Sequence, residues 1–125
     1  MKEGYVKLRK NLINESWYSD HACVRVYIHL LCKANWKPSN YKGKTIHAGQ
    51  TAISFGKLAE ETALTKSSVR SACERLEEMK EIKIQPCGNY TIFTLTHWAE
   101  EQATNTTKAK AKGNKPSYAN NGLDF

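Results

Sequence analysis

The clearest hydrophobic pattern in the chain lies over residues 21–35. Apolar residues there follow steps of 3, 1, 3 and 3, the spacing of one face of an α-helix, and they are Val24, Tyr27, Ile28, Leu31 and Ala34. Cys23, Val26 and Leu30 widen this face. Ser19 and Asp20 precede the stretch, and both are favoured N-cap residues. The pattern therefore predicts an amphipathic helix that begins after Asp20 and runs through HACVRVYIHLLCKAN.

Two further helices are predicted between residues 54 and 81. Ser54 can cap a short helix over residues 55–62, which Ala63-Leu64-Thr65 then interrupts. A longer helix begins at Lys66, and its apolar positions repeat the steps of 3, 1, 3 and 3, at Val69, Ala72, Cys73, Leu76 and Met79. This spacing places the intervening polar residues on exposed faces, namely Ser67, Ser68, Arg70, Ser71, Glu74 and Arg75.

Short strands are predicted on either side of this helical pair. Residues 45–51 are typical of a short strand with Gly49 at a turn, and residues 82–85 and 90–95 form a hairpin closed by Pro86-Cys87-Gly88-Asn89. Pro38, Asn40 and Gly43 indicate an irregular loop after the first helix. Four lysines lie on or beside that loop with no acid between them, at Lys33, Lys37, Lys42 and Lys44.

This order of elements predicts a fold class. Short helix, tight turn, longer helix and hairpin is the order of a winged helix-turn-helix, an α+β fold that is mainly helical with a small antiparallel sheet. From residue 101 onward the chain is rich in Thr, Asn, Lys, Ala and Gly, and cannot bury enough surface to fold alone. We therefore expect a winged helix-turn-helix domain over residues 1–102 and a disordered, flexible basic tail over residues 103–125.

The charge of the chain indicates its class of partner. Nineteen Lys and Arg against 12 Asp and Glu give a net charge of +7, which favours polyanions and nucleic acid first among them. The N-terminus MKEGYVKLRK lacks the apolar core of a signal peptide, and no apolar run is long enough to cross a membrane. We therefore expect a cytoplasmic protein without a membrane partner.

The sequence offers little support for metal, cofactor or catalysis. The four cysteines include no CxxC pair, and the His29 and Cys32 pair lacks two further ligands, so we expect buried or half-buried thiols and no metal. Gly43-Lys44-Thr45 ends like a phosphate-binding loop, but Pro38 stands where that motif needs glycine. No other catalytic motif is present, and we expect neither enzyme activity nor a cofactor.

Particular segments carry a family resemblance. LAEETALTKSSVRSACERLEEMKEIKI looks like the helix-turn-helix of winged-helix DNA-binding proteins. The flanking segments WYSDHACVRVYIHLLCKAN, IHAGQTAIS and NYTIFTLTHW are similar to the N-terminal domain of phage replisome organisers and DnaD-type primosomal proteins, over roughly residues 4–102. The resemblance implies a domain that binds origin DNA or self-associates. The family's C-terminal region, which meets the helicase loader or single strands, is not expected in a chain that ends at Phe125.

The chain departs from the family pattern at two turns. Ala63 stands before Leu64 where the family usually has glycine, and the glycine that usually ends the long helix is replaced within Met79-Lys80-Glu81. A side chain held in the left-handed conformation there costs about 1 kcal/mol. We expect these changes to weaken local stability without changing the fold.

The residue types of the long helix predict a DNA-contacting surface. Lys66, Ser67 and Ser68 open the helix, where backbone N–H groups favour phosphate. Arginine can donate two hydrogen bonds to guanine. Arg70, Ser71 and Arg75, further along the helix, are therefore expected to reach base edges or the DNA backbone. The predicted set comprises Lys57, Lys66, Ser67, Ser68, Arg70, Ser71 and Arg75, with Lys83 and Asn89 as backbone contacts of the wing. The alternative is solvated helix charges, with Arg70 pairing Glu74 and Arg75 pairing Glu78 or Glu81.

Three functions remain open at this point. The first is binding of double-stranded DNA in phage-type replication initiation, and the second is transcriptional regulation by a winged helix of similar build. The third is protein interaction or self-association, with a homodimer as one form. The tail is expected to strengthen nonspecific DNA binding; alternatively, Leu123 and Phe125 dock on another replication protein.

Overall fold

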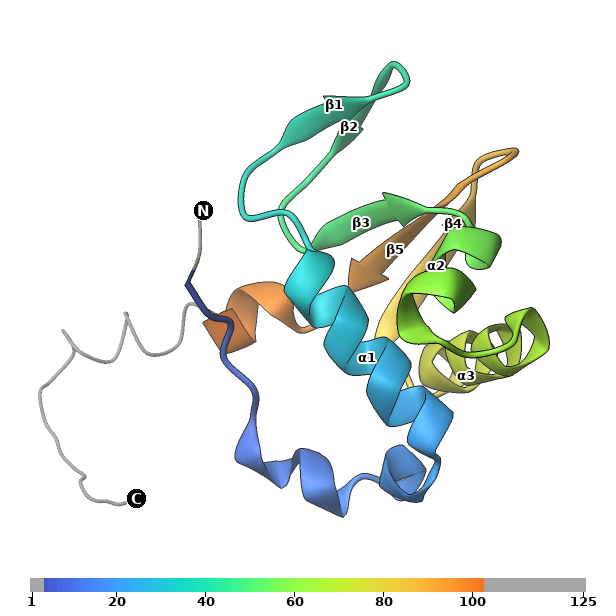
Figure 1. Cartoon of the computed structure of the whole chain (residues 1–125). Coiled ribbons are helices and arrows are strands. Elements are labelled where there is room, and N and C mark those ends of the chain that lie inside the picture. The colour runs from blue at the N-terminus through green and yellow to red at the C-terminus, as the bar shows by residue number, and fades with distance from the viewer. Residues whose placement is uncertain (1–3, 103–125) are drawn as a thin grey trace, which may run out of the picture.

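The computed structural model of the protein describes residues 4–102. They form an α+β domain with two small antiparallel sheets (Figure 1). The helices are η1 (Lys10–Asn14), η2 (Ser16–Ser19), α1 (His21–Lys33), α2 (Phe55–Thr62) and α3 (Lys66–Glu78), and residues 98–102 are also helical. The strands are β1 (Ser39–Tyr41), β2 (Lys44–Ile46), β3 (Gln50–Ile53), β4 (Ile82–Pro86) and β5 (Thr91–Leu95). The predicted tail over residues 103–125, with Leu123 and Phe125, lies outside the described residues.

One three-stranded sheet and the helices enclose the main core. The strand order is β3-β5-β4, with Thr51 opposite Phe93 and Ile84 opposite Phe93 in the two registers. Helices α1 and α2 both pack against α3, and the helices cover one face of the sheet (Figure 1). Fully buried side chains fill the space between these layers, including Val26, Leu30, Leu58, Val69, Leu76 and Phe93. None of the helices in residues 4–102 combines the length and apolar character needed to cross a membrane.

Helix α1 begins where the sequence predicts but buries a shifted face. The Asp20 carboxylate accepts hydrogen bonds from the backbone N–H groups of Ala22 (3.0 Å) and Cys23 (3.3 Å), which confirms the N-cap. The buried residues of the helix are Cys23, Val26, Tyr27, Leu30 and Leu31. Val24 is only partly buried and Ile28 is exposed, so the predicted face was wrong at these two positions. Both overlapping stripes fit helical spacing, and contact with α3 selects between them.

The expected irregular loop after α1 is a β-hairpin. Strands β1 and β2 pair with Tyr41 opposite Lys44, and Lys42 and Gly43 form a two-residue turn with φ of 51° and 82°. Positive φ at both positions matches the twist of a hairpin. The expected strand over residues 45–51 was also wrong as a single element. A turn ending at Gly49 (φ 83°) divides it into β2 and β3, which belong to different sheets.

A second, smaller apolar cluster attaches this hairpin to the outer face of the sheet. Ile46 of β2 packs there with Tyr90 and Ile92, and the rings of Tyr41 and Tyr90 meet edge to face at 5.1 Å between centroids. The Asn35 side-chain nitrogen donates to the Ile46 carbonyl at 3.0 Å. These contacts fix the hairpin in place beside the β4–β5 hairpin.

The caps of α2 and α3 confirm the predicted starts of both helices. Ser54 Oγ accepts from the Lys57 backbone N–H (3.0 Å), and Thr65 Oγ accepts from that of Ser68 (3.1 Å). Ala63, in the turn between the helices, is left-handed with φ 61° and ψ 36°. Lys80, just after α3, has φ 64°. Both departures from glycine therefore occupy the conformation that glycine favours.

Glycine at either position should stabilise the domain. We expect Ala63→Gly and Lys80→Gly each to raise the free energy of unfolding by about 1 kcal/mol, because a Cβ in the left-handed region is strained. Urea denaturation measures the change. Ser71→Gly, at an exposed position inside α3, is the matched control and should lower stability by about 0.5–1 kcal/mol. A loss of stability in both turn variants would contradict the strain argument.

Candidate nucleic-acid interface

The N-terminal end of α3 presents an exposed cationic surface. Lys66 and Ser67 are exposed, whereas Ser68 is half-buried and its hydroxyl accepts a hydrogen bond from the hydroxyl of Thr65 (3.0 Å). The positive end of the helix dipole adds to the charge of Lys66. This end of the helix therefore suits an anion such as a DNA phosphate.

Arg70 lies next to this end of α3 and rests on an aromatic ring of α2. Its guanidinium carbon is 4.5 Å from the centroid of the Phe55 ring, and Phe55 in turn meets Phe93 of the core edge to face at 5.5 Å. The first turn of α2 also approaches Lys66, because a Cβ on Gly56 would lie 3.6 Å from the Lys66 Cε atom. The alternative ion pair between Arg70 and Glu74 is not formed among the described residues. Arg70 is instead supported from α2.

The C-terminal half of α3 has a different character. Arg75 Nη1 lies 3.8 Å from Asp20 Oδ2, so Arg75 pairs with the cap of α1. The alternative pairing of Arg75 with Glu78 or Glu81 is not formed among the described residues. Arg75 and Ser71 line a shallow depression that also contains Glu74 and Glu78. The structure therefore groups Arg75 with acids, whereas Ser71 directly follows Arg70 and lies between the acidic and cationic parts of the helix.

The remaining predicted residues divide between two faces. Lys83 lies opposite Thr94 in the sheet, and its neighbours Ile82 and Ile84 pack on the helix side. Because side chains alternate along a strand, Lys83 points to the outer face of the sheet, away from α3. Lys57 Nζ lies 3.8 Å from Glu60 Oε1. Lys57 and Asn89 both line a groove beside the β1–β2 hairpin.

We call this concavity the basic groove, and sequence analysis did not predict it. It has a volume of about 550 Å³ and lies between the β1–β2 hairpin, the start of α2 and the β4–β5 loop. Its lining includes three lysines, three asparagines, two tyrosines and one acid: Lys33, Lys42, Lys57, Asn35, Asn40, Asn89, Tyr41, Tyr90 and Glu61. The lysines at the end of α1 and in the segment that follows it indicated a local concentration of positive charge. The convergence of Lys33 and Lys42 with Lys57 depends on tertiary structure.

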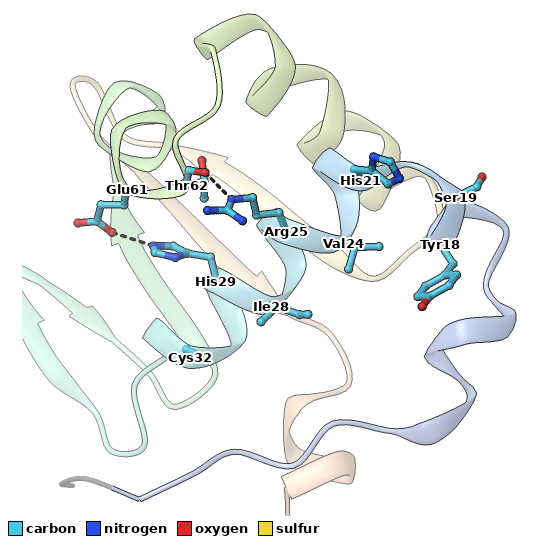
Figure 2. A pocket seen from close by; sticks show the side chains of 10 residues that line it. All are labelled: Tyr18, Ser19, His21, Val24, Arg25, Ile28, His29, Cys32, Glu61 and Thr62. Carbon is cyan, nitrogen blue, oxygen red and sulfur yellow. Dashed lines mark hydrogen bonds and ion pairs between the residues drawn. The ribbon is translucent and has the colours of Figure 1, made fainter.

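A second groove of about 860 Å³ runs along the outer side of α1 (Figure 2). Val24 and Ile28 supply apolar surface there, while His29 and Arg25 reach across to α2. His29 Nε2 hydrogen-bonds Glu61 Oε1 at 2.8 Å, and Arg25 donates to the Thr62 carbonyl. The hydrogen bond to His29 is the main influence that lowers the pKa of Glu61, with Lys33 assisting. Glu61 therefore lines both grooves as a carboxylate.

The cysteines differ in exposure. Cys23 and Cys73 are buried, and burial raises the pKa of each thiol to about 12. Cys87 is half-buried, but Cys32 is exposed, because it lies on the outer side of α1. The expectation of burial was therefore wrong for Cys32. Within residues 4–102 no group of three or more His, Cys, Asp or Glu side chains is arranged to hold a metal ion.

Comparison with protein-family models, curated proteins and solved structures finds no match to the chain. The function is therefore inferred from the chemistry of its own surfaces.

Proposed function

We propose that residues 4–102 form a winged helix-turn-helix that binds double-stranded DNA without enzymatic activity. In this proposal α2 and α3 are the helix-turn-helix, and the β4–β5 hairpin is the wing. The observation that carries the proposal is the polarity of α3. Its N-terminal end presents Lys66 and the supported Arg70, whereas acids gather toward its other end.

This polarity favours docking of α3 by its N-terminal end. The side chain of Lys66 and the backbone N–H groups of Lys66 and Ser67 are suited to a phosphate, which would fix the helix against the DNA backbone. The Ser68 N–H is already bonded to Thr65. Arg70 is then the candidate base reader, since arginine can donate two hydrogen bonds to guanine in the major groove. The Phe55 ring holds its guanidinium in a limited range of positions, so less conformational freedom is lost on binding. Phe55 acts as a positioning residue.

Within this class, we favour a role in phage-type replication initiation. The resemblance of the flanking segments to replisome organisers supports this choice, whereas the helix-turn-helix segment alone fits a transcriptional regulator equally well. The two roles differ in where the preferred site lies. Selection of genomic fragments by the purified protein, followed by sequencing, distinguishes an origin from a promoter.

The proposal predicts a specific loss in an Arg70→Ala variant. Binding to the preferred duplex should weaken by about 1–3 kcal/mol, and binding to random duplex far less, if Arg70 reads bases. Lys66→Gln should weaken both duplexes alike and lower the salt slope by about one. Fluorescence anisotropy with labelled duplexes measures these changes. Lys80→Gln, just after the opposite end of α3, is the control that removes the same charge.

The outcomes separate the roles of the residues. Equal losses on both duplexes would reassign Arg70 to the DNA backbone. Failure of the wild-type protein to bind any duplex at low salt would refute the proposed function.

A further inference from the structure

The β1–β2 and β4–β5 hairpins project from the same end of the domain (Figure 1). The basic groove is lined by residues of both. The β1–β2 hairpin contributes Lys42 and Asn40, and the β4–β5 loop contributes Asn89. Lys33 and Lys57 enter from the end of α1 and the start of α2. Side chains from four separate elements thus converge on one space.

The backbone conformation of Lys42 is the first observation that supports a function for this groove. Lys42 occupies the first position of a two-residue turn with φ 51°, where asparagine, aspartate or glycine is the favoured residue. Its Nζ atom lies 5.6 Å from the centroid of the Tyr41 ring and 5.8 Å from that of Tyr90. A lysine in an unfavourable conformation is therefore held over two rings at the edge of the groove. The strain costs stability locally, and what distinguishes Lys42 from the other left-handed residues is that its ammonium group is placed at the groove.

Charge is the second observation. The described lining residues include three lysines against one acid, Glu61, which lies 3.7 Å from Lys33 Nζ and is also bonded to His29. Asn40 accepts from the Gly43 backbone N–H through its side-chain oxygen at 3.3 Å, which leaves its amide nitrogen as a donor. Ammonium groups on flexible stems and amide donors suit phosphate oxygens, and carry no fixed pattern for reading bases.

We propose that the basic groove binds the sugar–phosphate backbone of DNA at a second place, beyond the segment that α3 contacts. This inference rests on the proposed function and extends its surface. Helix α2 connects the two regions, because Lys57 lies on it, Phe55 in its first turn supports Arg70, and an added Cβ on Gly56 would lie 3.6 Å from Lys66 Cε. The groove strengthens binding to every duplex without adding sequence preference.

The test compares lysines that line the groove with one that does not. Lys42→Asn removes a charge and places a favoured residue in the turn, so the hairpin keeps or gains stability. Lys33→Gln removes the second charge. The control is Lys44→Gln. Lys44 lies opposite Tyr41 on the same hairpin but does not line the groove. Affinity is measured by fluorescence anisotropy on preferred and random 30-base-pair duplexes over a series of salt concentrations.

Each groove variant should lower the slope of log affinity against log salt by about 0.9, and the double variant by about twice that, equally on both duplexes. Lys44→Gln should change the slope much less. Glu61→Gln, which releases Lys33, should strengthen binding to both duplexes.

Three results would overturn the inference. If the wild type binds duplex but the groove variants keep its slope, the groove does not contact DNA, although the proposed function stands. If a polyglutamate peptide binds the wild type and loses affinity in Lys42→Asn while DNA affinity is unchanged, the groove serves an acidic protein partner. If no duplex binds the wild type, the proposed function fails first, and this inference with it.

Discussion

Replacing Arg9 with alanine should lower the free energy of unfolding by roughly 3–5 kcal/mol. The Arg9 side chain, just before η1, forms ion pairs with three acids. Glu15 is close to it in the sequence, whereas Glu81 and Glu101 lie far along the chain. The Arg9 Nη2 atom lies 2.9 Å from Glu15 Oε2 and 3.1 Å from Glu81 Oε2, and its Nη1 atom lies 2.7 Å from Glu101 Oε2. The N-terminal segment is thereby attached to the end of the described chain.

The size of the expected loss follows from burial. The side chains of Arg9 and Glu81 are only 18% and 7% exposed, and Glu81 Oε1 already has no hydrogen-bond partner among the described residues. Burial disfavours the charged guanidinium, but the hydrogen bond to Glu101 and the charges of Glu81 and Glu101 outweigh it and raise the pKa of Arg9. Removing Arg9 would therefore leave a buried carboxylate without its partner, which is strongly destabilising.

A second substitution tests this explanation. Arg9→Ala combined with Glu81→Gln removes the buried charge together with its partner and should recover part of the lost stability. Arg25→Ala is the matched control, since Arg25 is exposed and donates to one carbonyl, and it should lose only about 1 kcal/mol. Chemical denaturation monitored by circular dichroism measures all four proteins. Equal effects of Arg9→Ala and Arg25→Ala would refute the account.

The helices were predictable because their signals are local. Asp20 and Ser54 cap the first two α-helices as their sequence positions indicate, and the periodic apolar residues of α3 are buried as predicted from Val69 to Leu76. Met79 is an exception, because it is the C-cap residue and is exposed. Local capping and periodicity define the element but leave its ends and its exact buried face to tertiary packing.

The β1–β2 hairpin was not predictable by the same means. All three residues of β1 are exposed, so no alternation of apolar and polar residues marks the strand. Its turn contains Lys42-Gly43 instead of the usual Asn-Gly. The hairpin is held by contacts with Tyr90, which lies far along the chain.

The candidate site was predictable in its residue types and less so in its geometry. The charges of Lys66 and Arg70 were evident, but the support of Arg70 by Phe55 and the pairing of Arg75 with Asp20 join different helices. The basic groove unites residues more than fifty positions apart. Such convergence is a property of the fold and has no short-range signature in the sequence.

The largest effect of a single added methyl group is expected at Gly49, where the chain passes from β2 to β3. We expect Gly49→Ala to lower the free energy of unfolding by about 2–4 kcal/mol, the sum of a left-handed penalty and overpacking. The backbone φ is 83°, and an added Cβ would lie 2.7–2.9 Å from side-chain atoms of Trp98. Trp98 cannot easily withdraw, because its ring packs edge to face on Trp36 at 4.9 Å between centroids.

The backbone around Gly49 is also fixed by hydrogen bonds. Its N–H donates to the Asn35 carbonyl (2.8 Å), and its carbonyl accepts from the Leu95 N–H (2.9 Å). Gly88→Ala is the matched control, since Gly88 has φ 78° but no atom within 4 Å of an added Cβ. It should lose only about 1–2 kcal/mol, so the difference between the two variants isolates the clash with Trp98.

Gly49→Ala should also affect DNA binding if the basic groove is a contact surface. Displacement at this turn would move the β1–β2 hairpin, and with it Lys42, while α3 stays attached to the core by Val69 and Leu76. Under conditions where the variant remains folded, we expect a lower salt slope but an unchanged preference between preferred and random duplexes. Equal stability losses at Gly49 and Gly88 in chemical denaturation would contradict the packing argument. A lost preference would mean that the turn also positions α3.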